Sequence, residues 1–432
     1  MPKAAPAPRR VAIVDGVRTP FARAMTHYAE MTALDLAVAA TRELVERLNL
    51  PTPVVEEVIM GTVIASTSTP NLAREVVLAS GLPRDIPGFT LNRACASGVQ
   101  AMICGAQGIQ SGAYECVLAG GGESLSSVPV PYSRTLIHSL LQMRKARDIK
   151  GRVAALKPLS MKDLLPRPPD LTEWSTGLTM GQHAEAMARK NNISRIEQDR
   201  YAFESHLKAA RAQAEGRFKD QLAVTFPPPR MKPVTEDNTV RTDADISAMS
   251  TLPPVFDKRY GTITAANASG LTDGASVVLL MSEEKAKSLG YTPLGFIKAY
   301  ANAALDPNDQ LLLGPAYATP KALDKAGLSL SDMSVVEMHE AFAAQVLSCT
   351  QAMASEQFCK DKLGRSKAVG EIEPDRFNPS GGSIALGHPF GATGGRLVIS
   401  ALRELARVKG QFALVTLCAA GGMGTSMILE RN

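Results

Sequence analysis

Four side chains of the kind that perform covalent catalysis stand at predicted strand ends or in glycine-rich loops. Cys95 lies where "TLNRA" ends and a predicted helix begins, and Cys418 ends the apolar run "FALVTLC". His388 lies in "GGSIALGHPFGATGG", and His339 lies in "VVEMHEAFAAQ". One nucleophilic thiol, a second thiol as acid and base, and nearby histidines together suit covalent acyl transfer.

Cys95 and Cys418 can each be interpreted as a catalytic thiol or as a structural core residue. A helix N-terminus favours thiolate at Cys95, and the small residues after Cys418 allow a ligand to approach backbone N–H groups. Free cysteines are equally often small buried core residues, so neither position is decisive by itself. The combination of two thiols and two histidines in similar settings favours chemistry.

The sequence predicts no metal site and no disulfide. His339 and Glu340 begin an HExxH pattern, but its second histidine is replaced by Ala343. None of the six cysteines forms a CxxC pair. A chain of 432 residues needs no disulfides for stability, so we expect free thiols in a reducing compartment.

Strand-like and helix-like segments alternate along the chain, which predicts an α/β fold. A similar order of segments recurs in the second half, where 293–302, 333–344 and 412–424 correspond to the first strand, 55–65 and 115–124. Strand ends from two such halves would meet at one crevice. The predicted parts are a first half at 1–126, completed by about 259–288, an inserted loop domain at 127–258, and a second half at 289–432.

Composition excludes several other classes of protein. The net charge of +5 is too small to indicate a nucleic-acid-binding protein, and no apolar run reaches the length of a membrane span. The start, "MPKAAPAPRR", has no apolar segment before a cleavage site, so it does not resemble a secretory signal. We therefore expect a cytoplasmic protein.

Five motifs occur in one order along the chain: "NRACASG", "TAANASGLTDGA", "MHEAFA", "GGSIALGHPFGATG" and "LCAAGGMG". With them the sequence resembles the thiolases (acyl-CoA C-acyltransferases) over nearly its whole length. The resemblance implies the thiolase fold, two duplicated βαβαβαββ halves in a layered α-β-α-β-α arrangement with an inserted loop domain. It also implies coenzyme A as a substrate, no bound cofactor or metal, and a homodimer or larger assembly.

The resemblance implies a role for each residue of the motifs. Cys95 is the nucleophile that is acylated, and His388 takes its proton and donates to the thioester oxygen. Cys418 is the acid and base that exchanges a proton with acetyl-CoA. The backbone N–H groups of Cys95 and Ala420 match an oxyanion hole. Ser269 matches a position that contacts coenzyme A, and Met180 matches a loop near the substrate.

Two departures point within the family to the β subunit of the fatty-acid-oxidation trifunctional enzyme. His339 stands where many thiolases have Asn, and Ala420 stands where the usual motif has the first of three glycines. The implied reaction is cleavage of 3-ketoacyl-CoA by coenzyme A to acetyl-CoA and a shortened acyl-CoA, and His339 would help form a further oxyanion hole, directly or through water. The alternative is an acetoacetyl-CoA thiolase working in the biosynthetic direction.

Two further classes are less consistent with these residues. A decarboxylating ketoacyl synthase would have two histidines and no second active-site cysteine, so Cys418 argues against it. A non-catalytic lipid-binding or scaffolding relative would lack the nucleophile or the GHP histidine, and this chain has both.

Residues 134–167 are strongly basic. They contain nine Lys and Arg, including Arg167, and two acids, Asp148 and Asp163, so their net charge is 9 − 2 = +7. Interleaved apolar residues make this segment typical of a membrane-surface or partner-binding element. A funnel for anionic coenzyme A and an ordinary solvated face are the alternatives. The trifunctional resemblance favours docking, to a hydratase/dehydrogenase α subunit or peripherally to the inner membrane (in the mitochondrial matrix if the source is eukaryotic).

Overall fold

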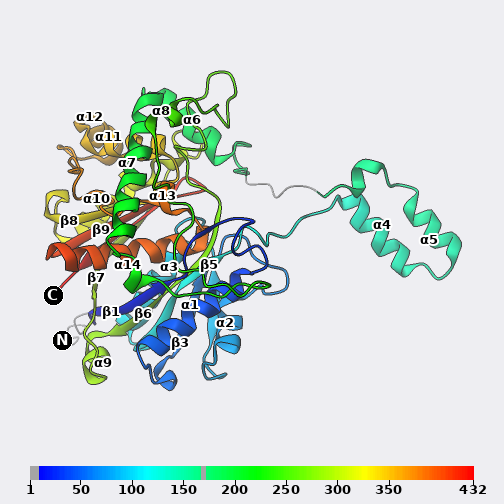
Figure 1. Ribbon diagram of the computed structural model, residues 1–432, viewed down its shortest axis with the longest axis horizontal. Helices are drawn as coiled ribbons and strands as arrows, with labels where there is room; N and C mark the ends of the chain where they lie inside the picture. Colours follow the sequence, from blue (N-terminus) through cyan, green and yellow to red (C-terminus); the bar gives the residue numbers. More distant parts are fainter. Residues whose placement is uncertain (1–8, 167–171) are drawn as a thin grey trace, which may run out of the picture. The chain divides into compact units, whose positions relative to one another are not determined.

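The structure, a computed structural model, describes residues 9–166 and 172–432, and these form two compact units. Of the described residues, the larger unit comprises 9–127 and 173–432, and the smaller unit comprises 128–166 and 172 (Figure 1). The insertion predicted at 127–258 is therefore not one compact unit. Its second part belongs to the larger unit because Ala184 and Met187 are buried among apolar residues of the C-terminal half.

A single continuous sheet runs through the larger unit in the order β4-β3-β5-β6-β1-β7-β10-β9-β8, and the short β2 pairs with β6. The strands are β1 Val11–Arg18, β2 Ala22–Arg23, β3 Glu57–Gly61, β4 Gly88–Leu91, β5 Cys116–Glu123, β6 Thr272–Ser282, β7 Gly295–Ala304, β8 Met333–Met338, β9 Phe412–Ala419 and β10 Met423–Glu430.

The two halves of this sheet repeat one pattern about the β1–β7 pair. In the first half β3, β4 and β5 are parallel and β6 returns antiparallel between β5 and β1. In the second half β8 and β9 are parallel and β10 returns antiparallel between β9 and β7. The place of β4 is taken there by Phe377, which forms one parallel bridge with Val336. The predicted duplication and fold class are thus confirmed.

Helices form three layers around the two halves of the sheet. The helices of the larger unit are α1 Ala33–Arg47, α2 Leu72–Ser80, α3 Ser97–Ser111, α6 Met180–Lys190, α7 Arg195–Ala214, α8 Ile246–Ser250, α9 Glu283–Ser288, α10 Gly314–Ala326, α11 Ala343–Ala354, α12 Glu356–Leu363, α13 Ser383–Leu386 and α14 Phe390–Val408. Figure 1 shows α3 and α14 in the middle, with α1 and α2 on one side and α10 and α11 on the other. The apolar residues of α3 and α14 form one core with strands of both halves, which confirms the α-β-α-β-α arrangement.

Glycines allow the two central helices to approach closely. A Cβ atom on Gly98 would lie 2.6 Å from the Gly391 carbonyl oxygen, and one on Gly394 would lie 2.5 Å from the Val99 nitrogen. Both contacts are too short for any side chain. The first turns of α3 and α14 are thereby held together, and each turn directly follows one of the candidate catalytic residues.

The smaller unit is a pair of helices, α4 Arg134–Lys145 and α5 Ile149–Leu156, followed by a 3₁₀ turn at Met161–Leu164. Ser133 and Asp148 cap the two helices by accepting from the backbone N–H groups of Leu136 and Gly151. Most of its large apolar side chains are exposed, and Arg167 of the basic segment lies outside the described residues.

Candidate active site

Cys95 lies in a tight turn between β4 and α3, one residue before the cap of the helix. Ala94 has a positive φ of 46°, and Asn92 Oδ1 accepts from the Ala94 N–H at 2.8 Å. Ser97 Oγ accepts from the Arg93 N–H and donates to the Ala94 carbonyl. These bonds fix the turn, so the thiol is presented from a rigid position.

The pKa of Cys95 differs from the sequence-based expectation. Cys95 is only partly exposed, and desolvation of its sulfur raises this pKa to about 12, although the N–H groups of Ala420 and of Cys95 itself act in the opposite direction. The helix N-terminus alone predicts a lowered pKa, and the desolvation of the thiol outweighs that effect. The resting residue is therefore a neutral thiol that needs a base to remove its proton.

His388 has the geometry of that base. Thr393 Oγ1 donates its only hydrogen to the Pro389 carbonyl at 3.0 Å, so it accepts from Nδ1–H of His388 at 2.6 Å. Nε2 is then the unprotonated nitrogen, and it is buried without a hydrogen-bond partner in the described part of the chain. Burial lowers the pKa of His388 to about 3, so the imidazole is neutral at rest.

His339, at the end of β8, lies against His388. The two ring centroids are 4.0 Å apart, and one nitrogen of each ring and Cys95 Sγ all lie within 4.8 Å of one another. His339 Nδ1 is 2.8 Å from Ser383 Oγ, and its Nε2 is buried with no partner within residues 9–166 and 172–432. Burial and the neighbouring His388 hold the pKa of His339 well below its usual value.

Cys418 is near the end of β9, paired with Gly424 of β10, and it is buried. Its pKa is raised well above the usual value by burial and then by the thiols of Cys95 and Cys349. The turn that follows has positive φ at Gly421 and Gly422, and the N–H of Gly421 donates to Glu173 Oε2 at 2.7 Å. Through this turn the Ala420 N–H reaches the Cys95 sulfur.

The predicted coenzyme A position Ser269 and the predicted substrate-loop residue Met180 lie on two different segments. The segment that begins at Ser269 runs beside His388, because the His388 N–H donates to the Gly270 carbonyl at 3.2 Å. Ser269 itself donates its N–H to the carbonyl of Ala341. Met180 begins α6 and packs on the core of the C-terminal half. A contact of either residue with substrate stays a prediction.

Several supporting residues were not identified from the sequence. Ser383 and Thr393 each hold one imidazole, and both lie inside the motif quoted for His388. Glu123, at the end of β5, accepts from the N–H groups of Val63, Ile64 and Gly391, and so ties the start of α14 to the first half. Glu123 directly follows three glycines in the run "GGGE", and a charged residue at the end of such an apolar strand is the sequence feature that could have identified it.

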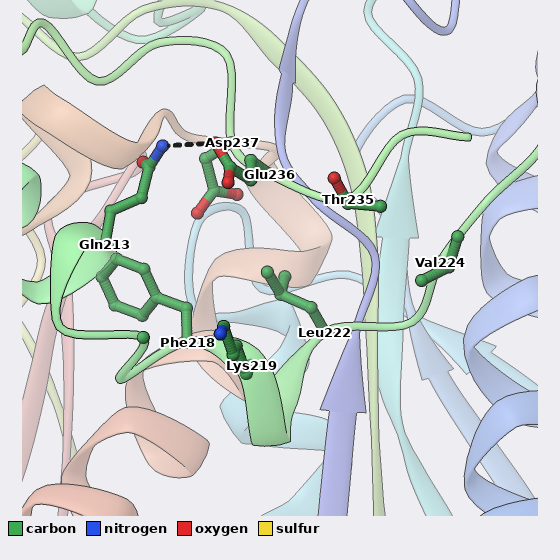
Figure 2. A pocket seen from close by; sticks show the side chains of 9 residues that line it. Gln213, Phe218, Lys219, Leu222, Val224, Thr235, Glu236 and Asp237 are labelled. Atoms are coloured by element: carbon green, nitrogen blue, oxygen red, sulfur yellow. Dashed lines mark hydrogen bonds between the residues drawn. The ribbon is translucent and has the colours of Figure 1, made fainter. Parts of the chain in front are cut away.

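A separate surface hollow contains none of these groups. It has a volume of about 280 Å³ and is lined by residues such as Gln213, Phe218 and Leu222 (Figure 2). Gln213 donates a hydrogen bond to Glu236, and both residues line the hollow. None of the candidate catalytic side chains lines this hollow, so the hollow is separate from the candidate active site.

Known proteins match this chain over nearly its whole length. The family model described as thiolase, N-terminal domain, matches residues 11–284, and the model described as thiolase, C-terminal domain, matches residues 291–431. The 3-ketoacyl-CoA thiolase of Pseudoalteromonas translucida is 46% identical over 98% of this chain and 97% of its own length. That of Photobacterium profundum is 45% identical with the same coverage.

Two solved structures have the same fold. The acetyl-CoA acetyltransferase of Bacillus anthracis has a TM-score of 0.84 at 33% identity, covering 99% of this chain and 100% of that one. Human mitochondrial 3-ketoacyl-CoA thiolase in complex with CoA has a TM-score of 0.84 at 33% identity, covering 98% of each chain.

Proposed function

We propose that this chain, which belongs to the thiolase family, cleaves 3-ketoacyl-CoA with coenzyme A to acetyl-CoA and an acyl-CoA shortened by two carbons. The observation that carries the proposal is the cluster of Cys95, His339 and His388, in which the thiol sulfur and one nitrogen of each imidazole lie within 4.8 Å of one another. Cleavage requires a nucleophile, a base and a donor to oxygen at one carbon centre, and this cluster supplies all three.

In the first half-reaction the Cys95 thiol gives its proton to Nε2 of His388, and the sulfur attacks the 3-keto carbon. The bond between C2 and C3 then breaks, the acyl group remains on Cys95 as a thioester, and Cys418 protonates C2 of the departing acetyl-CoA enolate. The enolate oxygen receives hydrogen bonds from protonated His388 and from His339. The N–H groups of Cys95 and Ala420 stabilise the oxygen of the attacked carbonyl.

In the second half-reaction coenzyme A regenerates the enzyme. The Cys418 thiolate takes the proton of the coenzyme A thiol, and the resulting thiolate attacks the acyl group on Cys95. The shortened acyl-CoA leaves, and Cys95 recovers its proton from His388. Both thiols and the imidazole return to their resting protonation states, so the cycle balances without an added cofactor.

The test is thiolysis of purified 3-ketoacyl-CoA of short, medium and long chain length with free coenzyme A. Cys95→Ala should abolish turnover with an unchanged circular dichroism spectrum. Cys104→Ala is the matched control, because Cys104 is a partly exposed cysteine on α3 and should be dispensable. Near-normal activity of Cys95→Ala would overturn the mechanism. Activity confined to acetoacetyl-CoA would instead favour the biosynthetic alternative.

We further propose that the smaller unit docks the enzyme to an anionic membrane surface, as the resemblance to the trifunctional β subunit implies. The supporting observation is that exposed Ile137, Leu140 and Leu141 of α4 accompany the basic residues of the segment. None of the helices within the described residues is long and apolar enough to cross a membrane. We also propose two protein partners, a second copy of this chain and a hydratase/dehydrogenase α subunit.

A further inference from the structure

A chain of buried polar groups lies behind His339. Ser383 Oγ is 2.8 Å from His339 Nδ1 and 2.9 Å from Arg396 Nη2, and Arg396 Nη1 is 3.1 Å from Glu337 Oε2. The side chains of Arg396 and Glu337 are fully buried, as are Ser383 and His339. An ion pair in this setting holds both partners in one geometry, because separating them would leave a buried charge unpaired.

The donor and acceptor inventory of these groups fixes where the protons lie. A guanidinium only donates, so Ser383 Oγ must accept from Arg396. The single hydroxyl hydrogen of Ser383 then has His339 Nδ1 as its acceptor, and no second acceptor lies within reach of it in the described residues. A neutral imidazole that accepts at Nδ1 carries its proton on Nε2.

We propose that Ser383, oriented by Arg396 and Glu337, is a positioning residue that sets the tautomer of His339 so that Nε2–H points into the reacting cluster. The inference rests on the proposed thiolysis, in which His339 donates to the enolate oxygen. The neighbouring imidazole has the opposite tautomer for a parallel reason. Thr393 donates to Pro389, accepts from His388 and leaves Nε2 of His388 free to accept the thiol proton.

Removal of the hydroxyl should disturb the tautomer. In Ser383→Ala the imidazole of His339 has no hydroxyl donor at Nδ1, so the proton can move to Nδ1 and Nε2 becomes an acceptor facing the enolate oxygen. The loss of one oxyanion donor typically slows turnover by roughly 10²- to 10³-fold. Because Ser383→Ala shifts the tautomer only in part, it should slow kcat by roughly 10- to 100-fold, with little change in KM. Ser383→Thr keeps the hydroxyl and should restore most of kcat.

A double-mutant cycle separates this role from a merely structural one. In His339→Asn the side-chain amide donates from its NH₂ group and has no tautomer to set. Ser383→Ala should therefore reduce kcat much less in the His339→Asn background than in the wild-type background. An equal reduction in both backgrounds would overturn the proposal.

Nitrogen-15 NMR of histidine-labelled protein gives a readout that does not depend on activity. The signals absent from His339→Asn identify His339, and in the wild type they should show a protonated Nε2. Ser383→Ala should shift them toward protonated Nδ1. A protonated Nδ1 in the wild type would refute the assignment, whereas absent thiolysis with the expected tautomer would refute only the proposed function.

Discussion

At the scale of single residues, Cys95 and His388 meet as two uncharged groups. Burial raises the pKa of Cys95 to about 12 and lowers that of His388 to about 3, because a desolvated site opposes charge on either group. A thiolate–imidazolium pair is therefore not the resting state. Proton transfer becomes favourable only when the substrate supplies a carbonyl carbon to the sulfur and a developing oxyanion to the donors.

This arrangement predicts a broad pH profile for the wild-type enzyme. His388 would become protonated only toward pH 3 and Cys95 would lose its proton only toward pH 12, so the reactive neutral pair persists between these limits. We expect kcat/KM for a 3-ketoacyl-CoA to be nearly constant from about pH 5 to pH 7, since this parameter reports ionisations of the free enzyme and burial raises the pKa of Glu337, behind His339, to about 8. Circular dichroism at each pH serves as the control for folding. A bell-shaped profile with an inflection between about pH 5 and pH 7 would contradict the neutral pair.

Sequence patterns could predict the reactive residues better than the groups that tune them. Cys95, His388 and Cys418 can be recognised in the sequence because each lies near the end of a predicted strand or the start of a predicted helix, with small residues around it. Ser383 lies in the same motif as His388, yet it contacts His339, which is 44 positions earlier. Only the fold shows that contact. Only the fold also shows the enclosure that reverses the expected pKa direction at Cys95.

At the scale of secondary-structure elements, the site depends on how closely α3 and α14 approach each other. Cys95 precedes α3 and His388 precedes α14, so any separation of the helices moves the nucleophile from its base. Glu123 reinforces the contact by accepting from the Gly391 N–H at the start of α14. The glycines in "CASG" and "GATGG" were visible in the sequence, but their partners across the interface were not.

Gly98→Ala tests this contact directly. The added methyl group would lie 2.6 Å from the Gly391 carbonyl oxygen, so the helices must separate. Overpacking of this kind typically costs about 1–3 kcal/mol of unfolding free energy, and we also expect a fall in kcat because Cys95 shifts relative to His388. Urea denaturation and thiolysis measure the two effects. Gly270→Ala, where a Cβ meets nothing within 4 Å, is the control for stability. Unchanged stability of Gly98→Ala would show that the helices adjust without cost.

At the scale of the whole molecule, the duplication explains why one site draws on both halves. The β1–β7 pair joins the halves, and matching strand ends then converge from each side. Cys95 comes from the first half, whereas His339, His388 and Cys418 come from the second. Periodicity in the sequence was sufficient to predict these halves. It could not predict that 173–258 packs with the larger unit, because that packing depends on buried faces of α6 and α7 rather than on local composition.

The smaller unit combines positive charge with exposed apolar surface, and the contribution of the charge to membrane binding can be tested by itself. Lys145, Lys150 and Lys157 are exposed, so their replacement together by Glu should weaken binding to anionic lipid vesicles and make the remaining binding less sensitive to salt. Lys321, Lys360 and Lys367 are exposed lysines of the larger unit, and their replacement by Glu is the matched control for net charge. Cosedimentation with vesicles, alongside thiolysis of a short-chain substrate in solution, measures the effect. Equal loss of binding in both triple variants would indicate a general charge effect. Lower thiolysis in the first variant alone would indicate that the segment attracts coenzyme A.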